Sequence, residues 1–147
     1  MSGLRCGWIL ARPELAWKMR RLNDVFAATP VHPGELLSVA VLERLEIPRE
    51  RARRVVEADR RELAAFLESA PGVAAVRTEW GTTCWVRLTG GGADDFLARL
   101  RAERETSAVP GRFFEMPDYF RIGMGVNSEM FAEGLRRLKA ALESARS

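Results

Sequence analysis

Tyr119-Phe120-Arg121-Ile122-Gly123-Met124-Gly125 alternates apolar residues with other residues near the end of the chain. Because successive side chains of a β-strand point to opposite faces, the segment predicts a strand with Phe120, Ile122 and Met124 on its apolar face. Arg121 lies on the other face with Tyr119 and Gly123, and its neighbours in sequence are the apolar Phe120 and Ile122. Its planar guanidinium matches a carboxylate, to which it can donate two parallel hydrogen bonds. The alternative is a solvent-exposed arginine that pairs with a neighbouring Asp or Glu.

The residues before and after this strand predict an antiparallel α+β unit. Segments 73–77 and 82–88 have the composition of two strands, and Glu79-Trp80-Gly81 between them predicts a hairpin. A short helix is expected over 94–103. Asn127 is expected to cap a last amphipathic helix, whose apolar residues recur at helical spacing.

The beginning of the chain predicts one strand followed by helices. Segment 3–10 reads as the strand, and Pro13 suits the first turn of the helix after it. A helix over 35–45 would be apolar nearly all round and would need packing on several sides, and a long helix is expected over 47–69. No second strand lies near 3–10 in sequence, so its hydrogen-bond partners must come from elsewhere. We therefore expect that this chain does not fold by itself alone.

Composition argues against several classes of protein. The net charge is +3, but basic and acidic residues are mixed along the predicted helices, which is typical of a salt-bridged face and not of a nucleic-acid site. The longest apolar runs are too short to cross a bilayer. The single histidine, His32, argues against a histidine-rich metal site and a Ser/His triad. Cys6 and Cys84 predict reduced thiols in a cytoplasmic protein.

Two segments, in this order, resemble the pyridoxal-phosphate-dependent aminotransferases of class I/II, which have fold type I. They are Ser2-Gly3-Leu4-Arg5-Cys6-Gly7-Trp8-Ile9 and Val109-Pro110-Gly111-Arg112-Phe113 with Phe120-Arg121-Ile122-Gly123 after it. Gly81-Thr82-Thr83-Cys84-Trp85-Val86 is similar to the family's small-domain hairpin, and residues 131–142 are similar to its C-terminal helix.

The resemblance implies an α/β protein, α+β within this chain, that forms the C-terminal part of a fold type I transferase. Residues 1–46 would be a remnant of the large cofactor-binding domain, with one strand and helices. Residues 47–147 would be the long connecting helix and the small antiparallel α+β domain.

The resemblance also implies site residues. Arg5 corresponds to the arginine that binds the phosphate of pyridoxal 5'-phosphate, and Arg121 to the arginine that binds the α-carboxylate of the substrate. Gly81 is near the position where the family's hairpin approaches the substrate. Thr29 lies in a segment that often reaches the neighbouring subunit's cofactor, although a turn threonine is usually a cap. Four aromatic residues are candidates to line a pocket, although we expect each to pack in the core: Trp80, Trp85, Phe113 and Phe114.

The lysine that binds the cofactor in this family should lie upstream of Met1. It forms a Schiff base with the cofactor and transfers the proton of the substrate. Lys18 and Lys139 are the only lysines in the sequence, and neither has the flanking residues of that site. The resemblance therefore implies transfer of an amino group between an α-amino acid and a 2-oxo acid, without a catalytic residue in this chain. We expect the isolated chain to be inactive, and a homodimer or a missing N-terminal portion to complete it.

Other functions stay open. A relative with the same fold could decarboxylate its substrate or eliminate from it. A non-catalytic protein that binds a partner chain is the second alternative, because the apolar helix over 35–45 would leave exposed hydrophobic surface. Nucleic-acid binding is the third, and its basis is only the positive charge.

Overall fold

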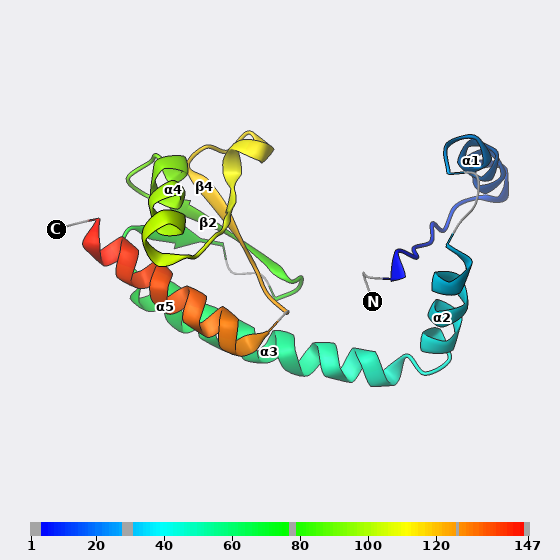
Figure 1. The fold of residues 1–147 in the computed structure, drawn as a ribbon, viewed down its shortest axis with the longest axis horizontal. Coiled ribbons are helices and arrows are strands. Elements are labelled where there is room, and N and C mark those ends of the chain that lie inside the picture. Colours follow the sequence, from blue (N-terminus) through cyan, green and yellow to red (C-terminus); the bar gives the residue numbers. More distant parts are fainter. Residues whose placement is uncertain (1–3, 28–30, 77–78, 126, 146–147) are drawn as a thin grey trace. The chain divides into compact units, whose positions relative to one another are not determined.

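The computed structural model describes residues 4–27, 31–76, 79–125 and 127–145. The chain divides into two compact units, residues 1–50 and residues 51–147, and each unit is described by itself. Figure 1 shows their helices and strands. Within the described ranges, none of the helices combines the length and the apolar character needed to span a membrane.

Unit 1, residues 1–50, consists of helices and irregular segments. Helix α1 spans Pro13–Phe26 and has its proline in the first turn, where the missing N–H is not needed. Helix α2 spans His32–Leu42. The strand predicted over 3–10 is not formed: Leu4 lies in a 3-10 turn and residues 5–12 have no regular structure. A strand needs a hydrogen-bonded neighbour, and the described strands of this chain all lie in unit 2.

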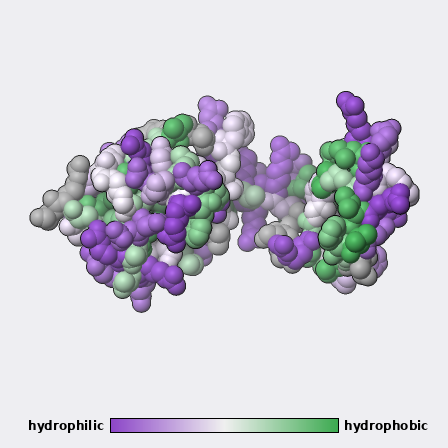
Figure 2. All heavy atoms as spheres, turned by 90° about the horizontal axis from the view of Figure 1, so that it is seen from above, coloured by the Kyte–Doolittle hydropathy of each residue, from purple (hydrophilic) through white to green (hydrophobic). Residues whose placement is uncertain are grey.

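The helices of unit 1 leave apolar side chains in contact with solvent. Helix α1 has no buried residue among those described, and the buried residues of α2 are Gly34 and Ser38. Figure 2 shows hydrophobic side chains at the surface of this unit. The exposed ones on α1 and α2 include Leu15, Trp17, Leu22, Val25, Phe26, Leu36, Leu37, Val39 and Leu42. The helix expected over 35–45 corresponds to α2, and its exposed apolar side chains agree with the prediction that it needs further protein packed against it.

Unit 2, residues 51–147, is an antiparallel sheet with helices on one face. The strands are β1 (Val73–Ala75), β2 (Thr83–Leu88), β3 (Val109–Pro110) and β4 (Tyr119–Gly123). Their order in the sheet is β1-β2-β4-β3, and every neighbouring pair is antiparallel. The helices are α4 (Ala93–Arg104), α5 (Ser128–Ser144) and most of α3 (Glu46–Ser69), whose first five residues belong to unit 1. A 3-10 turn, η2, spans Gly111–Phe114.

The hydrophobic core lies between the sheet and these three helices (Figure 1). Strand β4 contributes Phe120 and Ile122, both buried, while Tyr119 and Arg121 are half-buried on the opposite face. The alternation predicted from the sequence is therefore confirmed. The core residues of the helices are Leu63, Phe66, Phe96, Leu97, Leu100, Leu135, Leu138 and Leu142.

Two local features fix the chain on either side of β4. Gly111 starts η2 so close to the backbone carbonyls of Met116 and Tyr119 that a Cβ atom would collide with them. Only glycine fits this position of the turn. Asn127 caps α5 as predicted, because its Oδ1 accepts a hydrogen bond from the backbone N–H of Met130 at 2.9 Å.

Candidate functional site

The sheet face opposite the core carries the candidate substrate site. Strand β2 pairs with β4 so that Trp85 stands beside Arg121. The Cζ atom of Arg121 lies over the ring of Phe114 in η2, 5.3 Å from its centroid. The Phe114 ring in turn meets the Trp85 ring edge-on, with centroids 5.0 Å apart and an angle of 84° between planes. The Phe114 ring therefore contacts the Arg121 guanidinium, and the Trp85 ring packs against Phe114.

Arg121 has no carboxylate partner among the described residues. The alternative of a strand arginine paired with a neighbouring Asp or Glu is therefore not seen in the described part of the chain. The half-buried guanidinium keeps hydrogen-bond donors available for an anion that reaches this face. This is the arrangement that a carboxylate site requires.

Gly81 lies at the end of the same strand pair. It precedes β2, which pairs with β4 from Thr83 opposite Gly123, and the carbonyl of Thr82 accepts a hydrogen bond from the backbone N–H of Met124 at 2.8 Å. Gly81 has φ +90°, and no heavy atom lies within 4 Å of the position that a Cβ would take. Gly81 therefore lies in the bend just before β2, the strand that pairs with the strand of Arg121, and has open space at its Cβ position.

Arg5, the predicted phosphate-binding residue, lies in unit 1. It is exposed, has φ +53°, and borders a hollow of about 790 Å³ together with residues of α1 that include Met19 and Asn23. Arg5 and Arg121 belong to different units, so their convergence on one cleft remains a prediction. Thr29 lies outside the described residues.

The aromatic residues do not pack in the core as expected. Trp80 and Phe113 are 82% and 66% exposed, and Trp85 and Phe114 lie on the face opposite the core. The expectation failed because it treated apolar character as a sign of burial, whereas strand alternation puts Trp85 on the face of Arg121. That alternation was readable from the sequence. The contact with Phe114 was not, since it depends on the geometry of η2.

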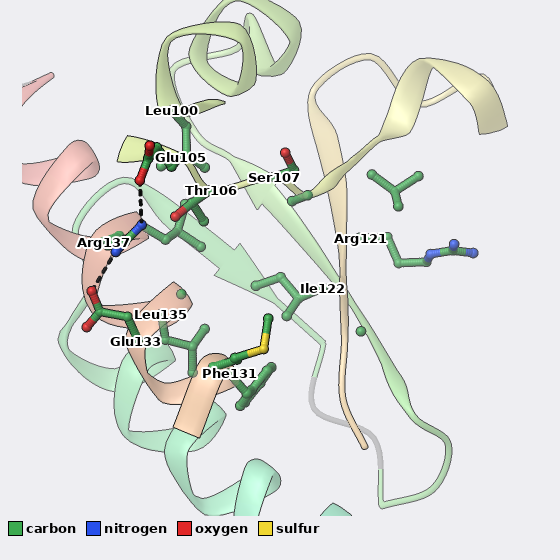
Figure 3. Close-up of a pocket in the computed structure, with 16 residues that line it drawn as sticks. Leu100, Glu105, Thr106, Ser107, Arg121, Ile122, Phe131, Glu133, Leu135 and Arg137 are labelled. Atoms are coloured by element: carbon green, nitrogen blue, oxygen red, sulfur yellow. Dashed lines mark hydrogen bonds and ion pairs between the residues drawn. The ribbon is translucent and has the colours of Figure 1, made fainter. Parts of the chain in front are cut away.

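A hollow of about 550 Å³ lies in unit 2, between β4 and α5 (Figure 3). Its wall is largely apolar and includes Leu100, Ile122, Phe131 and Leu135. Figure 3 shows that the side chain of Arg121 extends away from this hollow. Arg121 nevertheless lines part of this hollow, so the hollow and the candidate site share this residue.

Apart from Arg121, the charged residues that line this hollow are paired with other charged residues. Glu133 accepts hydrogen bonds from Arg136 and from Arg137, each at 2.6 Å, and these bonds lower the pKa of Glu133 to about 2. Arg137 also lies 3.9 Å from Glu105. Among the described charged residues that line the hollow, Arg121 is therefore the one without an oppositely charged partner.

Neither a metal centre nor a cofactor lysine is found in the described residues. No group of three or more His, Cys, Asp or Glu side chains comes together there. Lys139 lies on α5 and its Nζ donates a hydrogen bond to the Oγ of Ser69 at 3.0 Å, while Lys18 is exposed on α1.

Comparisons with known proteins all indicate one family, the aminotransferases. The family model described as aminotransferase class I and II matches residues 1–138. A relative in Aquifex aeolicus, described as a probable aspartate/prephenate aminotransferase, is 26% identical over 97% of this chain and 38% of its own length. The chain therefore spans about two fifths of that relative.

Solved structures give the same result for the fold. A PLP-dependent aminotransferase from Streptococcus suis superposes with a TM-score of 0.91 at 26% identity, over 97% of this chain and 38% of that one. An alpha-aminoadipate aminotransferase from Thermus thermophilus, complexed with N-(5'-phosphopyridoxyl)-L-leucine, gives a TM-score of 0.76 at 29% identity, over 97% and 39%. The predicted fold type I is thus confirmed, and the chain belongs to the class I and II aminotransferase family.

Proposed function

We propose that this chain is the C-terminal part of a pyridoxal-phosphate-dependent aminotransferase, and that Arg121 binds the carboxylate of its amino-acid and 2-oxo-acid substrates. The observation that carries the proposal is the guanidinium of Arg121, which rests on Phe114 and has no carboxylate partner among the described residues. A buried or half-buried cation that lacks a protein anion is well suited to bind an anionic ligand.

The residues around Arg121 suit this role. Phe114 covers one side of the guanidinium, and a lower local dielectric there would strengthen its interaction with a carboxylate. The two N–H groups that face the ligand would fix the orientation of the substrate as well as bind it. Gly81 has no side chain to prevent the approach of a substrate to the end of the strand pair.

For the cofactor we propose pyridoxal 5'-phosphate, with Arg5 as one contact to its phosphate. The exposed guanidinium of Arg5 beside a hollow fits a phosphate dianion, whereas the lysines of this chain do not fit the covalent role. When bound, this cofactor supplies an aldehyde for the amino group and a ring that accepts electrons. The lysine must therefore come from sequence outside this chain, and we expect the isolated chain to be inactive.

We further propose that the complete enzyme is a cytoplasmic homodimer of amino-acid metabolism. The exposed apolar side chains of α1 and α2 support additional protein surface against unit 1, from the missing portion or from a second subunit. Cys6 and Cys84 are both free thiols, which supports a reducing compartment.

The test of the proposal is an exchange at Arg121 in the enzyme that joins this chain to its upstream sequence. Arg121→Ala should raise KM for the amino acid by roughly 10- to 100-fold, since a hydrogen bond to a charged group contributes about 1.5–3 kcal/mol. Arg121→Lys should recover part of the loss, because it keeps the charge without the planar fork. Steady-state kinetics measures both.

Arg112→Ala is the matched control. Arg112 is exposed and pairs with Asp94 at 2.6 Å, so its loss should leave KM unchanged. If Arg121→Ala and Arg112→Ala give the same KM as the wild type, Arg121 does not bind the substrate. Reading the DNA upstream of Met1 gives an independent check, since the proposal requires an in-frame lysine codon in a Ser-x-x-Lys sequence there.

A non-catalytic protein that binds a partner chain is the second candidate. The exposed apolar helices of unit 1 favour it, because such surface is costly in an isolated protein. Size-exclusion chromatography of the 147-residue chain tests it. A monomer that melts cooperatively would exclude the need for a partner.

A further inference from the structure

Helix α3 places a carboxylate inside unit 2 that the proposed site does not use directly. Asp59 has an exposed fraction of 0%, and its Oδ2 accepts a hydrogen bond from the backbone N–H of Gly125 at 2.7 Å. Its Oδ1 has no hydrogen-bond partner among the described residues. A buried carboxylate with one oxygen unsatisfied lowers stability compared with an apolar residue of the same size. Its presence therefore calls for a reason other than stability.

Arg60, the next residue of α3, binds the segment before β2, whereas Asp59 binds the loop after β4. Arg60 donates a hydrogen bond from Nη2 to the carbonyl oxygen of Gly81 at 2.6 Å. The loop after β4 and the segment before β2 are themselves joined, because Met124 donates its N–H to the carbonyl of Thr82 at 2.8 Å. Consecutive residues of one helix thus bind two adjoining loops that are far apart in sequence.

The contacts at the two glycines differ in a way that fits this arrangement. At Gly125, with φ +93°, an added Cβ would lie 3.4 Å from the Cγ2 of Val56 on α3, so this loop is packed against the helix. A Cβ added at Gly81 would have no heavy atom within 4 Å. The helix therefore holds the loop pair from one side and leaves the side at Gly81 open.

We infer that Asp59 and Arg60 are positioning residues that fix the end of the β2–β4 pair, and with it Arg121 and Gly81. The inference rests on the proposed function of Arg121. Arg121 lies in β4, whose last residue is Gly123, and the Asp59 bond anchors the chain two residues further on. Without this anchor, the pairing with β2 and the bond from Met124 to Thr82 would hold the end of β4 without support from α3. A substrate-binding group that shifts by about 1 Å can lose up to about 100-fold in rate.

The first experiment measures the anchor itself in the 147-residue chain. Hydrogen exchange of the Gly125 amide should become faster in Asp59→Ala, because its acceptor is lost. Asp59→Asn keeps an oxygen at this position and should keep the amide protected. Glu62→Ala is the matched control, since Glu62 is an exposed acid on the same helix. Unchanged exchange in Asp59→Ala would overturn the inference.

The second experiment measures the consequence in the enzyme that joins this chain to its upstream sequence. Asp59→Ala should raise KM for the amino acid by about tenfold or more, with the affinity for the cofactor unchanged and Asp59→Asn close to the wild type. Arg60→Met, at a half-buried position, should act in the same direction, and it provides a second test if Asp59→Ala does not fold.

The outcomes separate this inference from the proposal on which it rests. If Arg121→Ala raises KM but Asp59→Ala and Arg60→Met do not, the residues of α3 are structural only and the inference fails. If Arg121→Ala itself leaves KM unchanged while the Gly125 amide still loses protection in Asp59→Ala, the proposed function fails and the anchor stands as a structural contact without a role in binding.

Discussion

Unit 1 and unit 2 differ in where their apolar side chains lie. In unit 2 one face of the sheet and three helices enclose a core that includes Val86, Leu100 and Phe120, each at most 1% exposed. In unit 1, α1 buries none of its described residues. Because burial of apolar surface is the dominant favourable term in folding, unit 2 can maintain its own fold, whereas unit 1 needs surface from elsewhere. Unit 2 therefore has a hydrophobic core of its own, whereas α1 of unit 1 contributes to none.

The largest effect is expected when the two units are prepared as separate peptides. A peptide of residues 51–147 should fold and melt in one cooperative transition, because it contains all residues of the core. A peptide of residues 1–50 should be largely unfolded, because its apolar side chains have no core to enter. Circular dichroism during heating measures both. A cooperative transition in the peptide 1–50 would contradict the comparison.

A matched pair of phenylalanines tests the same difference within the intact chain. Phe120→Ala should reduce the free energy of unfolding by about 3–5 kcal/mol, since Phe120 is 0% exposed and its loss leaves a cavity. Phe26→Ala, at a position 84% exposed on α1, should change it by less than about 0.5 kcal/mol. Urea unfolding followed by tryptophan fluorescence gives both values. Equal losses would mean that α1 is packed as firmly as the sheet.

The sequence was sufficient for the elements that depend on local pattern. The faces of β4, the Asn127 cap and the long helix α3 follow from alternation, capping preference and helical spacing, and the structure confirms all of them. The expected strand over 3–10 was wrong because a strand depends on a neighbour that this chain does not contain in its described residues. Local pattern cannot supply that neighbour.

The candidate site depended on contacts that no local pattern specifies. β2 and β4 are neighbours in the sheet although α4 and β3 lie between them in sequence, and this pairing brings Trp85 beside Arg121. The bond between Asp59 and Gly125 joins residues 66 positions apart. Resemblance to a family indicated Arg121 and Gly81, but only the three-dimensional arrangement revealed which residues hold them.

The smallest effect is expected at the surface of unit 2, where it measures how much the ion pairs of Glu133 contribute to the stability of the folded chain. Arg136 and Arg137 lower the pKa of Glu133 to about 2, whereas an unfolded glutamate has a pKa of about 4.3. The ionised form therefore stabilises the folded chain above about pH 4.3, and this contribution is lost as the pH falls towards 2. Glu133→Gln should lower the melting temperature slightly at pH 6 and not at pH 2, and high salt should reduce the difference. Glu143→Gln, an exposed acid on the same helix, is the control. If both variants respond identically to pH, the ion pairs of Glu133 contribute nothing to the stability of unit 2.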